Sequence, residues 1–381
     1  MMKIWKTLTF SSIFAISACS STATKQDDHS IGMKDAFRDS FTIGAAINKA
    51  QIYQQEAGTT QVIQKHFNTL TAENEMKWEA MQPREGQFNF DVSDTLVAFS
   101  EQNDIFLVGH TLLWHHQTPE WVFQDDKGQP ASRDLLLSRL KTHIDTVAGR
   151  YKGRIQGWDV VNEALNEDGS WRESPWYKIL GEDYIHKAFE FAAAAAPNAE
   201  LYYNDYNLFK PEKRDGAVKI VKSLQAKGLR IDGIGIQGHY GIGYPDLTQL
   251  EDSIKAFSAL DVDVMITELD VSVLPFPEAE NQGADISIDL ALQERLNPYP
   301  NGMDAEISKQ FSDHYLDLFK LFLKYKSSIS RITFWGVNDG QTWRNDWPMK
   351  GRTDYPLMFD RNNQAKQVLL DLVEYKKSLA K

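Results

Sequence analysis

Short apolar runs alternate along the chain with longer segments in which apolar residues recur every three or four positions. The short runs predict buried strands at 41–47, 69–74, 105–110, 155–162, 200–204, 233–238, 263–268 and 331–336. The longer segments predict amphipathic helices near 54–67, 92–103, 133–151, 183–196, 211–228, 247–260, 306–326 and 363–379. In segment 133–151, one apolar stripe illustrates the helical period: Leu136, Leu140, Ile144 and Val147.

Eight strand–helix repeats predict an α/β fold, the (β/α)8 or TIM barrel, as a single domain over 39–381. An open doubly wound sheet is the alternative, and the glycines of 233–238 match the pattern G-x-G-x-x-G. A dinucleotide site requires these glycines in a turn that opens a helix. Here they alternate with isoleucine inside a predicted strand and lead to His239. We therefore expect the barrel, with glycines that allow close strand packing, and no cofactor.

The composition restricts the classes of partner. A formal charge of −12 argues against binding to nucleic acid or to an anionic membrane surface, because like charges repel. A neutral polysaccharide is compatible with that charge. A hydrophobic content of 42% with ten tryptophans suffices for a large core. Separately, we expect a monomer.

The N-terminus carries a processing signal. Lys3 and Lys6 precede the apolar stretch 8–18, which is too short to span a bilayer permanently. It ends at Cys19, the only cysteine of the chain, and Ile-Ser-Ala-Cys resembles the lipobox of bacterial lipoproteins. The resemblance implies a signal peptide over 1–18, lipidation of Cys19, and a polar tether over 19–38. It also implies a protein anchored in the bacterial cell envelope, and Ser20 after Cys19 is compatible with sorting to the outer membrane. An ordinary cleaved signal peptide is the alternative.

Two glutamates, Glu163 and Glu268, each end a short apolar run. In a (β/α)8 barrel the active site lies at the C-terminal ends of the strands, so both carboxylates are expected at one mouth. Paired carboxylates are the minimal machinery for cleaving a glycosidic bond. For one isolated glutamate, a helix cap or a solvated rim position is the alternative.

The other strand ends deliver polar and aromatic side chains to the same mouth. The predicted set comprises Glu73, Asn74 and Lys77 after the second strand, His110 and Trp114 after the third, Asn162 in the fourth, Asn204, Asp205, Tyr206 and Asn207 after the fifth, Gln237 and His239 after the sixth, Asp270 after the seventh and Trp335 after the eighth. Such side chains suit the hydroxyls and apolar faces of sugar rings. Taken singly, His239 reads equally well as a core histidine, and a tryptophan as core packing.

Together these segments resemble the family 10 glycoside hydrolases, the retaining β-1,4-xylanases. The matching motifs are Thr71-Ala-Glu-Asn-Glu-Met-Lys-Trp78, Gly109-His-Thr-Leu-Leu-Trp-His115, Trp158-Asp-Val-Val-Asn-Glu-Ala164, Tyr203-Asn-Asp-Tyr-Asn207, Ile236-Gln-Gly-His239, Ile266-Thr-Glu-Leu-Asp270 and Phe334-Trp-Gly336. They follow the family order from about residue 40 onward.

The resemblance implies a role for each matching residue. Glu163 would be the general acid/base, Asn162 would bond the sugar 2-hydroxyl, and Glu268 would be the nucleophile. His239 and Asp270 would hold Glu268 charged and oriented. Further implied sugar contacts are Glu73, Asn74, Lys77, His110 and Gln117 on the non-reducing side, Trp114, Trp335 and Trp343 as aromatic walls, Tyr206 and Asn207 toward the leaving group, and Gln237.

Three alternatives remain open on the sequence. A β-1,4-glucanase or mannanase would use the same carboxylate pair, and a glycan-binding lipoprotein would use the barrel without catalysis. A metallohydrolase using His110, His115 and His116 is the weakest alternative, because no metal-ligand motif occurs. The long segment 275–303 departs from the family pattern, and it is expected to cover the leaving-group side.

Overall fold

The computed structural model describes residues 31–379, in which eight parallel strands pair side by side into a closed ring. The strands are β1 (Thr42–Ile47), β2 (Thr69–Ala72), β3 (Phe106–Leu113), β4 (Gly157–Asn162), β5 (Glu200–Asp205), β6 (Gly233–Ile236), β8 (Asp263–Ser272) and β9 (Ile329–Phe334). The pairing of β6 with β8 closes the ring, so the barrel has no open edge. The predicted (β/α)8 barrel is confirmed, and the open doubly wound sheet is wrong.

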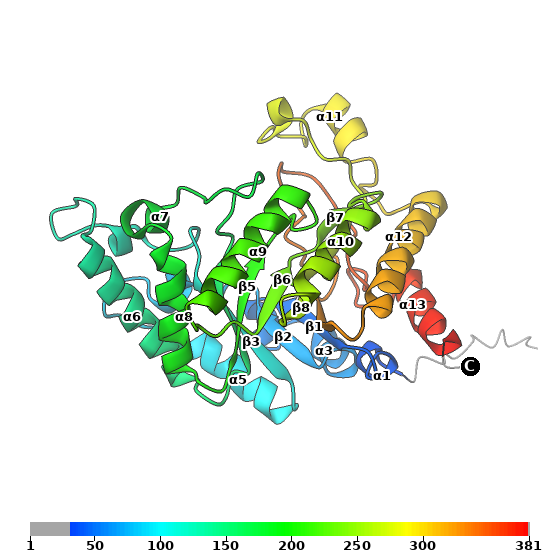
Figure 1. Cartoon of the computed structure of the whole chain (residues 1–381). Coiled ribbons are helices and arrows are strands. Elements are labelled where there is room, and N and C mark those ends of the chain that lie inside the picture. The colour runs from blue at the N-terminus through cyan, green and yellow to red at the C-terminus, as the bar shows by residue number, and fades with distance from the viewer. Residues whose placement is uncertain (1–30, 380–381) are drawn as a thin grey trace, which may run out of the picture. The chain divides into compact units, whose positions relative to one another are not determined.

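Long helices alternate with the strands and surround them (Figure 1). They are α3 (Thr59–His66), α5 (Asp91–Gln102), α6 (Arg133–Arg150), α8 (Asp183–Ala195), α9 (Pro211–Ala226), α10 (Leu247–Ser258), α12 (Ala305–Lys324) and α13 (Gln367–Ser378). The sequence pattern predicts each of these. It misses the short elements, which hold too few residues to show a period: α1 (Met33–Ala36), α2 (Lys49–Ile52), α4 (Trp78–Met81), η1 (Glu120–Phe123), α7 (Pro175–Leu180), β7 (His239–Gly241), η2 (Ala279–Asn281) and α11 (Leu290–Leu296).

The compact unit begins at Ile31, inside the segment predicted as tether. Met33 and Phe37 are fully buried, and the Phe37 ring stacks on Phe41 with centroids 5.5 Å apart. The predicted start at residue 39 is therefore too late, because the apolar residues of α1 pack against α3 and α13. The predicted signal peptide and Cys19 lie outside the described residues, so lipidation and localisation stay predictions. Within residues 31–379, no helix combines the length and apolar character needed to cross a membrane.

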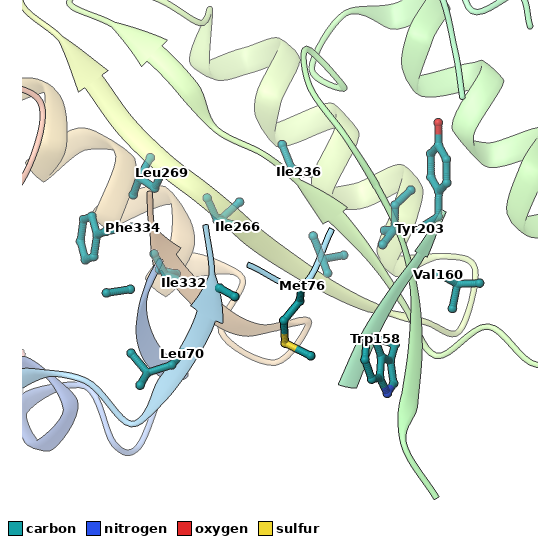
Figure 2. Close-up of a cluster of buried hydrophobic side chains, with 14 of the residues drawn as sticks. Leu70, Met76, Trp158, Val160, Tyr203, Ile236, Ile266, Leu269, Ile332 and Phe334 are labelled. Atoms are coloured by element: carbon teal, nitrogen blue, oxygen red, sulfur yellow. The ribbon is translucent and has the colours of Figure 1, made fainter. Parts of the chain in front are cut away.

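Inside the ring, Val108 of β3, Tyr202 of β5 and Met265 of β8 form a small cluster, and the larger hydrophobic cluster contains buried residues of both the strands and the surrounding helices. Figure 2 shows part of the larger cluster, including Leu70 of β2, Ile266 of β8 and Ile332 of β9. Trp158 of β4 is fully buried, and it fits only because its neighbour on β3 is glycine. A Cβ atom on Gly109 would lie 2.2 Å from the indole ring of Trp158.

The segment 275–303 after β8 is structured. It contains η2 and α11, and in Figure 1 it stands apart from the ring of barrel helices. A small apolar cluster secures it: Ile286, Leu296 and Met349. The Arg352 guanidinium also donates hydrogen bonds to the carbonyl of Leu296 at 3.1 Å and to that of Pro275 at 2.8 Å. Packing therefore holds this long connection in one place.

We predict that Gly109→Ala destabilises the barrel by roughly 1–3 kcal/mol, because the added methyl group collides with Trp158 in a packed core. Gly149→Ala is the matched control, because no atom lies within 4 Å of its added Cβ and it sits in helix α6. That control is expected to gain up to ~1 kcal/mol. Urea unfolding followed by circular dichroism measures both, and equal stability of the two variants would contradict the packing argument.

Candidate active site

A cleft of about 1140 Å³ lies at the C-terminal ends of the strands. The side chains predicted for the site line it, apart from Asn204 and Asp205, which are fully buried at the end of β5, and two further exceptions. Asp270 is the first exception, because it is fully buried behind His239. Gln117 is the second, and its amide reaches the site indirectly by donating to the Asn74 side-chain oxygen at 3.3 Å.

Glu268, on β8, is held by two donors. Asn204 Nδ2 donates to Oε1 at 2.8 Å, and His239 Nε2 donates to Oε2 at 3.1 Å. Burial alone would raise the pKa of Glu268, but the His239 hydrogen bond and the positive potentials of His110 and His239 outweigh it. The net effect lowers the pKa, so this carboxylate is ionised at neutral pH.

His239 is itself held between two carboxylates. The short strand β7 pairs with the end of β8 and places His239 opposite Asp270, so that Nδ1 lies 3.1 Å from Asp270 Oδ1. Burial opposes the charged imidazole, but Asp270 and Glu268 raise the pKa of His239 to about 9. The imidazolium therefore donates from both ring nitrogens.

Asp270 completes this chain of charges. Its carboxylate accepts hydrogen bonds from Trp343 Nε1 at 2.7 Å and from Arg344 Nε at 2.9 Å. Burial opposes ionisation, yet Arg344 and His239 lower the pKa of Asp270 to about 2. Asp270 thus keeps its charge, and with it the charge of His239.

Glu163 has a different environment. It follows the last residue of β4, and its backbone adopts a φ of 56°, a left-handed conformation that residues other than glycine rarely take. Its carboxylate accepts from Trp114 Nε1 at 2.9 Å and from Gln237 Nε2 at 3.0 Å. Both donors are neutral, and the residue is partly exposed to the cleft. No cation forms an ion pair with it among the described residues.

A row of amides joins the two carboxylates. The β4–β5 register sets Asn162 opposite Asn204, and their side-chain amides lie 3.0 Å apart. Asn204 continues to Glu268, and Gln237 lies 3.3 Å from Asn162 and continues to Glu163. Gly235, opposite Asn204 on β6, leaves the space, since a Cβ there would lie 2.3 Å from the Asn204 oxygen. This explains one glycine of 233–238 by close packing.

At the end of β2 the cleft wall is formed by Glu73, Asn74 and Lys77. Lys77 Nζ donates to Asn74 Oδ1 at 3.0 Å and lies 4.9 Å from the ring centre of Trp114. Burial lowers the pKa of Lys77, against the attraction of Glu268. Burial also raises the pKa of Glu73 to about 7, although Lys77 opposes the rise. These groups form a polar wall with donors and acceptors at short spacing.

Trp335 forms an aromatic wall of the cleft. It is 7% exposed and packs edge-on against His110, with centroids 5.3 Å apart, and against His239 at 6.4 Å. His110 is in turn fixed by Asp159, whose Oδ2 lies 2.8 Å from Nδ1. The indole therefore has little freedom to move.

At the end of β5, Tyr206 and Asn207 line the far part of the cleft. Arg172 Nη2 donates to the Tyr206 hydroxyl at 2.8 Å. Asn207 accepts from the Tyr244 hydroxyl at 2.9 Å and donates to Glu167 at 3.2 Å. Both side chains are thus held by partners outside the predicted set.

Sequence reasoning missed several residues of the site. The sequence predicts Asn204 at a strand end but assigns it no role. Thr267 donates to the Asn204 side-chain oxygen at 2.6 Å, and nothing in the sequence signals this contact. The roles of Arg344 and Asp159 also give no sequence signal, because their partners Asp270 and His110 lie on other elements, far away in the chain. Within residues 31–379, no three His, Cys, Asp or Glu side chains gather in a metal-ligand cluster.

A closed (β/α)8 barrel with two carboxylates, amides and aromatic walls in one cleft defines a glycosidase of the carboxylate-pair class. The chain belongs to glycosyl hydrolase family 10, whose sequence model matches residues 32–375. The family resemblance seen in the sequence is therefore confirmed.

Known relatives cover nearly the whole chain. Endo-1,4-beta-xylanase A of Xylanibacter ruminicola is 46% identical over 90% of this chain and 92% of that protein. Beta-1,4-xylanase of Dictyoglomus thermophilum is 42% identical over 90% of each. A solved endoxylanase structure from a sugarcane soil metagenome is similar with a TM-score of 0.85 and 41% identity, covering 91% of this chain and 99% of that one. Another, a mutant in complex with xylotriose, has a TM-score of 0.81 and 35% identity, covering 90% and 99%.

We predict that His239 makes the free energy of unfolding depend on pH between about 6.5 and 9. Folding raises the pKa of His239, so its stabilisation is complete below the unfolded value of about 6.5 and is lost as the pH rises through about 9. The stability difference between the wild type and His239→Gln should shrink over this range by on the order of 2 kcal/mol.

Urea titrations at several pH values measure this difference. His143→Gln is the control, because burial lowers the pKa of His143 to about 3, and a neutral histidine adds no pH dependence above its unfolded value. A constant difference for His239→Gln across the range would show that His239 is not held as a cation.

Proposed function

We propose that Glu268 is the nucleophile and Glu163 the general acid/base of a retaining endo-1,4-β-xylanase, which cleaves internal bonds of xylan and xylo-oligosaccharides. The proposal rests on the different hydrogen-bond partners of the two carboxylates in one cleft. Glu268 is kept ionised by the chain of His239 and Asp270, whereas Glu163 is held by two neutral donors. An ionised group suits attack on carbon, and a group without a cation partner suits proton exchange.

The reaction proceeds in two displacements. Glu268 attacks the anomeric carbon while Glu163 gives its proton to the leaving glycosidic oxygen, which yields a glycosyl-enzyme ester and a shortened chain. Glu163, now a base, takes a proton from water, and the water oxygen attacks the same carbon and releases Glu268. Two inversions restore the β configuration. Asn162, which lines the cleft beside Glu163, is assigned to the sugar 2-hydroxyl in this proposal.

The sugar positions follow from the walls of the cleft. Glu73, Asn74, Lys77 and His110 offer the hydrogen-bonding set for two sugars on the non-reducing side, with Gln117 holding Asn74. Trp114, Trp335 and Trp343 offer ring faces, and Gln237 positions both Asn162 and Glu163. Tyr206 and Asn207 receive the leaving-group sugar.

Xylose is preferred over glucose because of Trp335. Its indole packs against His110 and His239. In this proposal the indole lies beside carbon five of the sugar at the cleavage point and leaves little room there. A hydroxymethyl group there would have to displace a packed side chain. This argument favours the xylanase over the glucanase or mannanase.

We predict that the two glutamates fail differently when replaced. Glu268→Ala should lose at least about 10⁴-fold in rate on every substrate, because no other group can form the covalent intermediate. Glu163→Ala should still glycosylate when the leaving group is a phenolate that needs no proton, and should then stall before hydrolysis. Burst kinetics with an aryl xylobioside and steady-state rates on xylan measure both, and equal losses of Glu163→Ala on the two substrates would reverse or remove its assignment.

We predict that the first product of xylan digestion carries the β configuration at its new reducing end. Proton NMR of a fresh digest reads the anomer directly. A parallel digest of β-1,4-glucan should be slower by about 10–200-fold, because a misfitting group in a packed wall costs roughly 1–3 kcal/mol. An α product at early times, or faster cleavage of glucan, would refute the retaining mechanism or the sugar choice respectively.

A further inference from the structure

A buried lysine lies beneath the leaving-group side of the cleft. Lys213, the third residue of α9, is fully buried, which is rare for lysine unless it is paired. Its Nζ lies 3.0 Å from Asp205 Oδ1 and 3.6 Å from Glu167 Oε1. Asp205, the last residue of β5, is also fully buried. The fold thus holds an ion pair in a place where ions are costly, and the reaction steps above do not use it.

From Asp205 the contacts lead to the peptide beside Glu163. Asp205 Oδ2 accepts a hydrogen bond from the Tyr203 hydroxyl at 2.5 Å, and that hydroxyl oxygen accepts one from the Ala164 N–H at 3.3 Å. An ionised carboxylate only accepts, so Tyr203 must donate to it and keeps its lone pairs for Ala164. The Tyr203 ring belongs to the larger hydrophobic cluster (Figure 2), which fixes the position of its hydroxyl.

The Glu163 backbone needs this support. Its φ of 56° is an unfavourable conformation that persists only when the surroundings hold it. The Glu163 N–H donates to the Asn204 carbonyl at 2.9 Å, and the Glu163 carbonyl accepts from Arg172 Nε at 3.1 Å. Tyr203 supplies the third restraint, on the next residue. The carboxylate that exchanges the proton is therefore aimed by its backbone.

The same lysine also fixes Tyr206. Lys213 Nζ lies 3.3 Å from the centre of the Tyr206 ring, and Arg172 donates to the hydroxyl of that ring at 2.8 Å. A cation over one face and a hydrogen bond at the edge leave the ring one orientation. Lys213 thus contacts the leaving-group wall and is also the cation of the ion pair behind Glu163.

We propose that Lys213 and Asp205 are positioning residues, which through Tyr203 hold Glu163 in its strained conformation and through Tyr206 fix the wall for the leaving-group sugar. The inference rests on the proposed role of Glu163 as acid/base. Neither residue touches the substrate.

The charges of this group act on Glu163 as well. Burial raises the pKa of Asp205 to about 6, with Lys213 lowering it and repulsion from Glu163 raising it. Asp205 and Glu163 are thus close enough to repel each other. The charged and titratable groups around them come from several elements: Lys77, His115, Glu167, Arg172, Tyr184, Tyr203, Tyr206 and Lys213.

The first test removes only the hydroxyl link, with both charges kept. Tyr203→Phe should lower kcat on xylan on the order of tenfold, because a loosened Glu163 is less often aimed at the leaving oxygen. Its glycosylation rate with an activated aryl xylobioside should stay within about twofold, since a phenolate needs no proton. Tyr151→Phe is the matched control, because it removes another buried hydroxyl, bonded to Ser93 at 2.7 Å and Asp94 at 2.8 Å outside the site. It should leave both rates unchanged.

The second test reads the pH profile of kcat/KM on xylan, whose alkaline limb reports the loss of the acid proton. Asp205→Asn removes one negative charge and leaves Lys213 with only the more distant Glu167, which favours the ionised form of Glu163, so the limb should move to lower pH by about one unit. Adding Lys213→Met removes the excess charge and should return the limb toward the wild type. A merely structural role would lower activity at every pH and leave the limb in place.

Glu163→Gln, measured in parallel, separates the two levels of failure. If its profile keeps the alkaline limb, Glu163 is not the acid, and the proposed function fails. If the Glu163→Gln profile lacks the alkaline limb, Glu163 is the acid. In that case, an unmoved limb in Asp205→Asn, or equal rate losses of Tyr203→Phe on both substrates, overturns only the positioning role. If Asp205→Asn does not fold, the Tyr203→Phe comparison decides the inference alone.

Discussion

The closure of the strand ring between β6 and β8 is the constraint on which the site depends. Once the ring is closed, the C-terminal ends of all eight strands surround one mouth, and residues from 73 to 354 of the chain meet there. Register then sets the details. A parallel pairing places Asn162 opposite Asn204, and β7 places His239 opposite Asp270. A slip by one residue would turn these side chains to the other face of their strands.

Within that mouth, two chemically identical side chains are given different tasks by their neighbours. Glu268 is bonded to a histidine that two carboxylates keep protonated, so its negative charge is compensated in a buried place. Glu163 meets an indole and an amide, which hold its position without supplying a charge. The division between nucleophile and acid/base that we propose is therefore a property of the environment rather than of the residue type.

The barrel carries several ionised groups that are fully buried. Asp270 is paired with Arg344 and His239, and Asp205 with Lys213, so each charge has a partner. Such pairs add little to stability, because desolvation offsets their attraction, but a pair that loses one partner is strongly destabilising. Because these pairs lie directly behind the two glutamates, we infer that they orient the glutamate side chains.

The sequence by itself predicted the (β/α)8 barrel, the eight long helices and most residues of the cleft. This worked because each depends on a local pattern: an apolar period of two or 3.6, or a polar residue at the end of an apolar run. The start of the folded unit at Ile31 was misjudged, since α1 is too short to show a period and is held by contacts with distant helices. Only the tertiary structure decided the partners of Asp270, Asn204 and Lys213, the left-handed backbone of Glu163, and the clearance that Gly109 and Gly235 leave for neighbouring strands. These depend on which side chains meet between elements that are far apart in the chain, and the order of the amino acids does not show which distant residues lie close together in space.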